Sequence, residues 1–195
     1  MLRTTNAIIL SLQPYSDKAH ILHAYTRANG RVNYKVYGLG RKHAIGLYTP
    51  LSLVQITAEY PVSGMPTVRE TTQHNSQITH QTSISSDPYK RTIALFIAEV
   101  LFHVLRHPMA DEPMFDYIAD SIEELENCAE PQNFHIAFLI GLAAKLGFGM
   151  EHEPPLPNSR QERQKTLRDL CAYFAEMVET WQEPKSLDIL MAVFD

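Results

Sequence analysis

The chain has 195 residues, of which 45% are hydrophobic and 20% charged, and its formal net charge is −5 at pH 7. This composition is typical of a soluble globular protein and excludes a disordered chain, and the length suits one large domain or two small ones. No apolar run approaches the length that a membrane span needs. The first residues show no apolar stretch followed by a cleavage site, so we expect no signal peptide and a cytoplasmic location.

The first part of the chain alternates between apolar and polar residues, as half-buried strands do. In the first segment, Ile8, Leu10 and Leu12 are predicted to share one face. Turn signals follow at residues 14–17 and at Asn29-Gly30. Five short antiparallel strands are predicted, at residues 6–13, 18–26, 32–37, 51–60 and 67–72. They predict a small Greek-key barrel, for which an OB-fold and an SH3-like barrel fit the periodicity equally well.

A polar segment at residues 73–86 leads into a part of the chain with helical periodicity. Ser86-Asp87-Pro88 is a helix start, and Ser159 with Glu162 forms a capping box. Five helices are predicted: residues 88–107, a helix opened by Pro113, and residues 134–146, 160–181 and 186–194. The predicted class is therefore α+β, with a barrel domain at residues 1–82 and an all-helical domain at 83–195.

Positive charge is concentrated in the predicted barrel. Residues 1–80 contain eight Lys or Arg against three Asp or Glu, a net +5. Residues 81–195 contain nine against nineteen, a net −10. Such asymmetry indicates that one part of the chain binds a polyanion and the other does not.

The segment Lys35-Val36-Tyr37-Gly38-Leu39-Gly40-Arg41-Lys42-His43 is the most distinctive in the barrel half. Two glycines permit a sharp turn, and the adjacent cations and aromatic residue suit phosphates and bases. The alternative is a surface loop with ordinary solubilising charge. Our candidates for contacts with a nucleic acid or another polyanion are Arg27, Arg31, Lys35, Tyr37, Arg41 and Lys42, with Lys18 and Arg69 as further candidates. Tyr34 and Tyr37 should face opposite sides of their strand, so that one of them is in the core.

Several short segments occur along this chain in the same order as in a known family. They include Pro14-Tyr15-Ser16-Asp17-Lys18, Tyr37-Gly38-Leu39-Gly40-Arg41-Lys42, Leu47-Tyr48-Thr49-Pro50-Leu51-Ser52-Leu53, Leu95-Phe96-Ile97-Ala98-Glu99-Val100-Leu101 and Lys185-Ser186-Leu187-Asp188-Ile189-Leu190. In this order they resemble the RecO family of bacterial recombination mediators, most closely its shorter zinc-free members.

The resemblance implies an N-terminal OB-fold and a C-terminal helical domain. It also implies binding of single- and double-stranded DNA without sequence preference, annealing of complementary strands, and help from RecR in loading RecA onto DNA coated by the single-strand binding protein SSB. It implies a groove in the helical half for the acidic, aromatic-ended tail of SSB, to which we assign no residues. No nucleotide, cofactor or covalent chemistry is implied, so we expect no enzyme, and a bacterial protein associated with the nucleoid.

The sequence departs from many RecO proteins in its cysteines. Cys128 and Cys171 lack the Cys-x-x-Cys spacing of a zinc site, so no structural zinc is expected. His103 and His107 are four residues apart but have no third ligand in the pattern. Two other functions remain open: an adaptor of RecO-like fold that binds RecR or SSB with little DNA binding, and a small metal-dependent hydrolase that uses the histidines.

Overall fold

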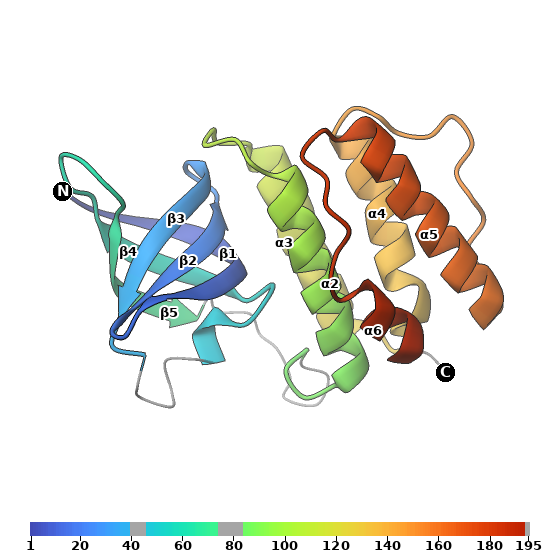
Figure 1. Cartoon of the computed structure of the whole chain (residues 1–195), viewed down its shortest axis with the longest axis horizontal. Helices are drawn as coiled ribbons and strands as arrows, with labels where there is room; N and C mark the ends of the chain where they lie inside the picture. The colour runs from blue at the N-terminus through green and yellow to red at the C-terminus, as the bar shows by residue number, and fades with distance from the viewer. Residues whose placement is uncertain (40–45, 74–83, 194–195) are drawn as a thin grey trace. The chain divides into compact units, whose positions relative to one another are not determined.

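The computed structural model describes residues 1–39, 46–73 and 84–193 (Figure 1). The chain forms two compact units. One comprises Met1–Gln77 and Leu105–Ile122, and the other comprises Ile78–Val104 and Glu123–Asp195. Residues 105–122 therefore pack with the barrel, after the chain has already contributed a helix to the other unit. The expected boundary between residues 82 and 83 lies outside the described residues.

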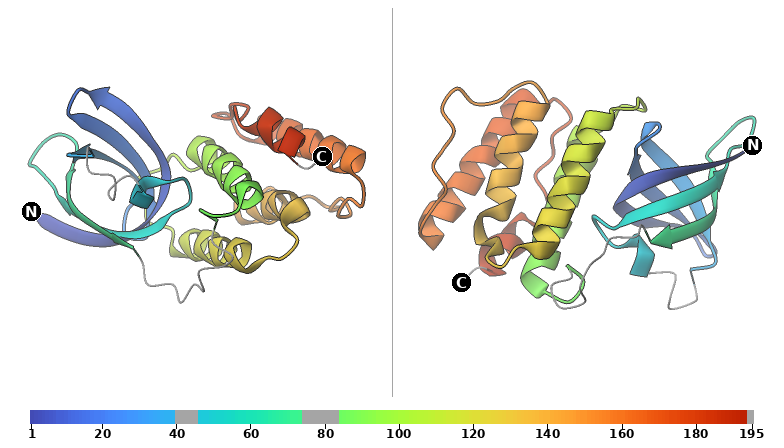
Figure 2. Two further views of the ribbon diagram at one scale, coloured as in Figure 1. Left: turned by 90° about the horizontal axis from the view of Figure 1, so that it is seen from below. Right: turned by 180° about the vertical axis from the view of Figure 1, so that it is seen from behind.

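The first unit is built on five strands that close into a barrel, as Figures 1 and 2 show. The hydrogen-bonded order is β1-β2-β3-β5-β4, and β4 pairs back onto β1. The contact between β3 and β5 is parallel, and the other pairs are antiparallel. The strands are β1 Leu2–Ser16, β2 Ala19–Thr26, β3 Gly30–Tyr37, β4 Leu53–Glu59 and β5 Thr67–Gln73. A barrel of five strands in this order is of the OB type.

The barrel interior is filled by alternate residues of the strands. Ile9, Leu22, Tyr34 and Ile56 are all fully buried in one hydrophobic cluster. The Tyr34 hydroxyl lies 3.1 Å from that of Tyr60, so its polar end has a partner inside the barrel. Burial of these side chains is the main source of barrel stability.

One detail of the prediction for β1 is wrong. Ala7 and Ile9 belong to the barrel core and Leu12 packs against it, whereas Ile8 and Leu10 are buried outside that cluster. The reason is a register shift between Ile9 and Ser11. The extra residue of a β-bulge reverses the face of every side chain after it, so a simple two-residue period cannot hold along this strand.

The predicted helices are present, but two of them end earlier than expected. They are α2 Pro88–Val104, α3 Glu112–Asn127, α4 Phe134–Lys145, α5 Arg160–Met177 and α6 Leu187–Val193. The Asp87 carboxylate accepts hydrogen bonds from the Tyr89 and Lys90 amides at 2.8 and 3.3 Å. The predicted capping box at Ser159 is also confirmed. Helix α2 ends at Val104, before the expected His107, and α5 ends at Met177 rather than at the expected residue 181.

In the helical unit, α4 packs against α2 and α5, and α2 packs against α6. Figure 1 shows α4 and α5 side by side. The Glu99 carboxylate accepts hydrogen bonds from the Ser186 amide at 3.0 Å and hydroxyl at 2.7 Å. This contact fixes the start of α6 on α2.

Within the described ranges, no helix combines the length and the apolar character needed to cross a bilayer.

Candidate nucleic-acid interface

The outer face of β3 presents polar and aromatic side chains to solvent. Because side chains alternate along a strand, the buried Tyr34 and Val36 point inward while Lys35 and Tyr37 point outward. The prediction that Tyr34 and Tyr37 face opposite sides is therefore confirmed. Tyr34 is the core residue and Tyr37 is 55% exposed.

A second exposed aromatic residue lies close to Lys35. The Lys35 ammonium nitrogen is 6.0 Å from the centroid of the Tyr15 ring, and Tyr15 is 61% exposed. This distance is at the limit of a cation–π interaction. Tyr15, Lys35 and Tyr37 together form what we call the tyrosine–lysine face, at the end of the barrel where β1 turns into β2.

Sequence reasoning did not include Tyr15 among the candidate contact residues. The segment 14–17 was predicted to be a turn, but β1 continues to Ser16. The signal that was available is an aromatic residue directly before the first hairpin of an OB-type barrel, since this hairpin and the outer surface of strands two and three bind oligonucleotides in that fold. Lys18 is exposed in the same hairpin turn.

Arg27 is held inside its own unit by acidic residues of α3. Its guanidinium donates to Asp116 Oδ1 at 2.5 Å and to Glu112 Oε2 at 3.1 Å, and it lies 5.7 Å from the centroid of the Phe115 ring. The hydrogen bonds to Asp116 and then Glu112 raise the pKa of Arg27. A DNA contact by Arg27 stays a prediction, and it would have to compete with these two carboxylates.

Arg31 is also engaged with the segment before α3. Its amide donates to the His107 carbonyl at 3.1 Å, and its Nη1 donates to the Leu105 carbonyl at 3.3 Å. Burial, and then the nearby charge of Arg106, lower the pKa of Arg31 to about 10. The side chain is thus still charged at pH 7, and its role as a DNA contact stays a prediction.

The remaining candidates are divided by where they lie. Arg41 and Lys42 lie outside the described residues. Gly38, which leads toward them, has φ +73°, the left-handed region that favours glycine. Arg69 donates to the Glu59 carboxylate at 2.9 Å through Nε. The structure thus places Lys35 and Tyr37 together on one face, and Arg27, Arg31 and Arg69 in contacts within the barrel unit.

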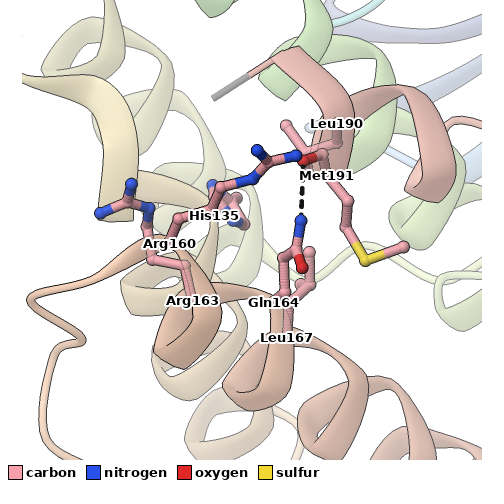
Figure 3. A pocket seen from close by; sticks show the side chains of 7 residues that line it. All are labelled: His135, Arg160, Arg163, Gln164, Leu167, Leu190 and Met191. Atoms are coloured by element: carbon pink, nitrogen blue, oxygen red, sulfur yellow. Dashed lines mark hydrogen bonds between the residues drawn. The ribbon is translucent and has the colours of Figure 1, made fainter. Parts of the chain in front are cut away.

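The helical unit contains a pocket between three helices, shown in Figure 3. Gln164 Nε2 donates to the Met191 carbonyl at 3.2 Å across it. The lining residues are His135 of α4, Arg160, Arg163, Gln164 and Leu167 of α5, and Leu190 and Met191 of α6. Two arginines beside leucine side chains suit a ligand that is both acidic and apolar.

His135 is neutral in this pocket at physiological pH. Its side chain is 2% exposed, and burial, followed by the charge of Arg163, lowers its pKa to about 3. The positive charge at the pocket therefore comes from Arg160 and Arg163 rather than from the imidazole.

No three His, Cys, Asp or Glu side chains within the described ranges are grouped closely enough to hold a metal ion. Cys128 and Cys171 are free cysteines. Burial raises the pKa of Cys171 to about 12, so this thiol is unreactive. His103 belongs to α2 whereas His107 follows its end, so the two do not share a helical face.

The fold and the exposed face define the class of protein: an OB-type barrel with aromatic and cationic side chains at its first hairpin, joined to a helical unit. Residues 1–76 match the family model described as "Recombination protein O N terminal", and residues 85–153 match "Recombination protein O C terminal".

Three relatives illustrate the similarity, all named DNA repair protein RecO. That of Phocaeicola vulgatus is 34% identical over 175 residues, which cover 87% of this chain and 68% of the relative. That of Porphyromonas gingivalis is 35% identical over 154 residues, covering 75% of this chain and 61% of the relative. That of Flavobacterium johnsoniae is 27% identical over 235 residues, covering 97% of this chain and 98% of the relative. The chain belongs to the RecO family of DNA repair and recombination proteins.

Proposed function

We propose that this chain binds single- and double-stranded DNA without sequence preference and anneals complementary strands. Together with RecR it then assists the loading of RecA onto single-stranded DNA coated by SSB, in the bacterial cytoplasm at the nucleoid. The observation that supports DNA binding is the tyrosine–lysine face on an OB-type barrel, with Tyr15 and Tyr37 both exposed beside Lys35. Such a surface offers stacking and phosphate neutralisation, which need no particular base sequence.

The proposal involves no covalent chemistry. Annealing needs only that two strands be held close together while their charge is reduced, so binding is sufficient for it. We therefore expect the activity to require neither a nucleotide nor a metal ion.

The direct test is fluorescence anisotropy with a labelled single strand and a labelled duplex over a series of salt concentrations. Binding should weaken steeply with salt, because each neutralised phosphate releases counterions. Lys35→Ala should lower affinity for both DNAs and make the salt dependence shallower, by about 0.7 in the log–log slope for a single strand. Lys165→Ala, which removes an exposed lysine from α5, is the matched control and should change neither quantity.

We infer that the pocket in the helical unit binds the acidic, aromatic-ended tail of SSB. Its arginines would contact the carboxylates, and the side chains of Leu167 and Leu190 would contact the apolar end. A labelled tail peptide should bind the wild type, and Arg160→Glu should weaken that binding at least about tenfold, since like charges at an interface cost several kcal/mol. Arg168→Glu on the same helix, away from the pocket lining, is the matched control.

The alternative function is an adaptor that binds RecR or SSB with little DNA binding of its own. It is favoured by the ion pairs that occupy Arg27 and by the net charge of −5. If the wild type binds the SSB tail and RecR but shows no salt-sensitive DNA binding even at low salt, the adaptor replaces the mediator as the proposed function.

A further inference from the structure

We propose that the tyrosine–lysine face takes up unstacked bases and so makes the barrel prefer single-stranded DNA to duplex. This inference rests on the proposed DNA binding. It adds Tyr15 as the residue that, together with Tyr37, gives the preference for single-stranded DNA. Three observations support it: the bulge that places Tyr15, the exposure of both rings, and the pairing of cations elsewhere on the barrel.

Tyr15 is placed by an irregularity in the sheet. Pro14 pairs with His20 and Ser16 pairs with Ala19, so two steps along β1 match one step along β2. Tyr15 is therefore the extra residue of a β-bulge. Bulges redirect a side chain and are frequent at barrel rims and beside functional sites. Here the bulge brings the ring within 6.0 Å of the Lys35 ammonium on β3.

The second ring is left uncovered by its neighbour. Tyr37 is opposite Ala19 in the β2–β3 ladder, and alanine is too small to cover an aromatic face. Tyr37 is 55% exposed and Tyr15 is 61% exposed.

Other cations of the barrel contribute less to this face. Arg27 is paired with Glu112 and Asp116, and Arg69 with Glu59. Among the described residues, Lys35 and the exposed Lys18 supply ammonium groups at this end of the barrel, and two exposed aromatic rings accompany them. A surface that only neutralised phosphates would need no exposed rings.

The exposed rings distinguish single-stranded DNA from duplex DNA. Bases in a single strand can leave their stack and lie on a tyrosine ring, whereas the paired bases of a duplex expose only their edges in the grooves. Phosphates are available in both forms. Removing a ring should therefore weaken binding to single strands selectively, and removing Lys35 should weaken binding to both.

The test compares an oligonucleotide single strand, the same strand with abasic sites, and the corresponding duplex, by anisotropy with the full chain. Tyr15→Ala and Tyr37→Ala should each weaken single-strand binding by about five- to 150-fold, the range measured for loss of one stacked base. Their binding to the duplex and to the abasic strand should change by less than about twofold. Tyr15→Phe should keep the wild-type values, because stacking needs the ring and not the hydroxyl.

Tyr89→Ala, which removes a tyrosine of α2 that is 46% exposed, is the matched control and should bind all three DNAs as the wild type does. Equal weakening of all three DNAs by Tyr15→Ala, or no weakening at all, would overturn the inference while leaving DNA binding intact. Absence of DNA binding by the wild type would instead refute the proposed function. A thermal melt of each variant verifies that the barrel is folded.

Discussion

Arg27 and Asp116 form an ion pair with 2.5 Å between Nη1 and Oδ1, although they are 89 positions apart in the chain. The same guanidinium also donates to Glu112. Phe115, which lies between Glu112 and Asp116 in the sequence, stacks on Tyr25 with 6.4 Å between the ring centroids. The start of α3 is thus attached to the β2–β3 hairpin by charge and by aromatic packing. This attachment explains why residues 105–122 belong to the barrel unit.

The Arg27–Asp116 pair should contribute modestly to the stability of the barrel unit. Because the two side chains are 39% and 48% exposed, solvent screens the interaction, and we expect only a small favourable coupling free energy. A double-mutant cycle with Arg27→Ala and Asp116→Ala, followed by urea unfolding, measures it. A coupling free energy near zero would show that packing of Phe115 alone holds the helix there.

Gly30 should tolerate no side chain. A Cβ at this position would lie 2.2 Å from the Met109 carbonyl oxygen and 2.7 Å from that of His107, and φ is +61°. Gly30→Ala should therefore add a steric cost of about 1–3 kcal/mol to the backbone cost of about 1–2 kcal/mol. Urea unfolding of the variant and of the wild type measures the total loss in free energy of unfolding.

Gly38→Ala is the control for that substitution. Gly38 has a similar φ of +73°, but a Cβ there would meet no atom of the described residues within 4 Å. Gly38→Ala should therefore lower the free energy of unfolding only by the backbone cost, so Gly30→Ala must be the more destabilising of the two substitutions. Equal losses would mean that the segment at residues 107–109 moves away without cost.

Tyr34→Phe should lower the stability of the barrel and leave DNA affinity unchanged. The substitution removes the 3.1 Å hydroxyl contact with Tyr60, which costs about 1 kcal/mol for a buried hydrogen bond. Thermal unfolding and DNA anisotropy on the same variant give the two results. A change in DNA affinity at constant stability would place Tyr34, not Tyr37, at the interface.

His135 should make the helical unit less stable in mild acid. Its pKa is lowered to about 3 in the folded state, first by burial and then by Arg163, while an unfolded histidine has a pKa of about 6.5. Below pH 6.5 the unfolded chain gains a proton that the folded chain does not, so stability falls as pH falls. Between pH 6.5 and pH 5 the loss from this residue is about 2 kcal/mol.

Urea unfolding followed by the fluorescence of Trp181 measures that loss, since the tryptophan packs 5.4 Å from Phe174 in the helical unit. His135→Gln should flatten the dependence on pH, and His152→Gln, an exposed histidine, should not. An unchanged pH dependence in His135→Gln would assign the acid sensitivity to other groups.

Much of the fold could be predicted from local patterns. Asp87 and Ser159 were recognisable as helix caps because a cap acts on amides two or three residues away. The strands were recognisable by their two-residue period, and the alternation of Tyr34 and Tyr37 followed from it. The end of α2 could not be predicted in this way, because the Leu105 and His107 carbonyls bond to Arg31, far away in the chain.

The sequence by itself determined the order of the elements, the concentration of positive charge in the barrel half and the family resemblance, since each depends on residue type and short spacing. Only the tertiary structure decided which charges face solvent, because the partners of Arg27 are 85 and 89 residues away. It also decided that Tyr15 meets Lys35, because the bulge at Tyr15 is a property of pairing between two strands and not of either strand alone.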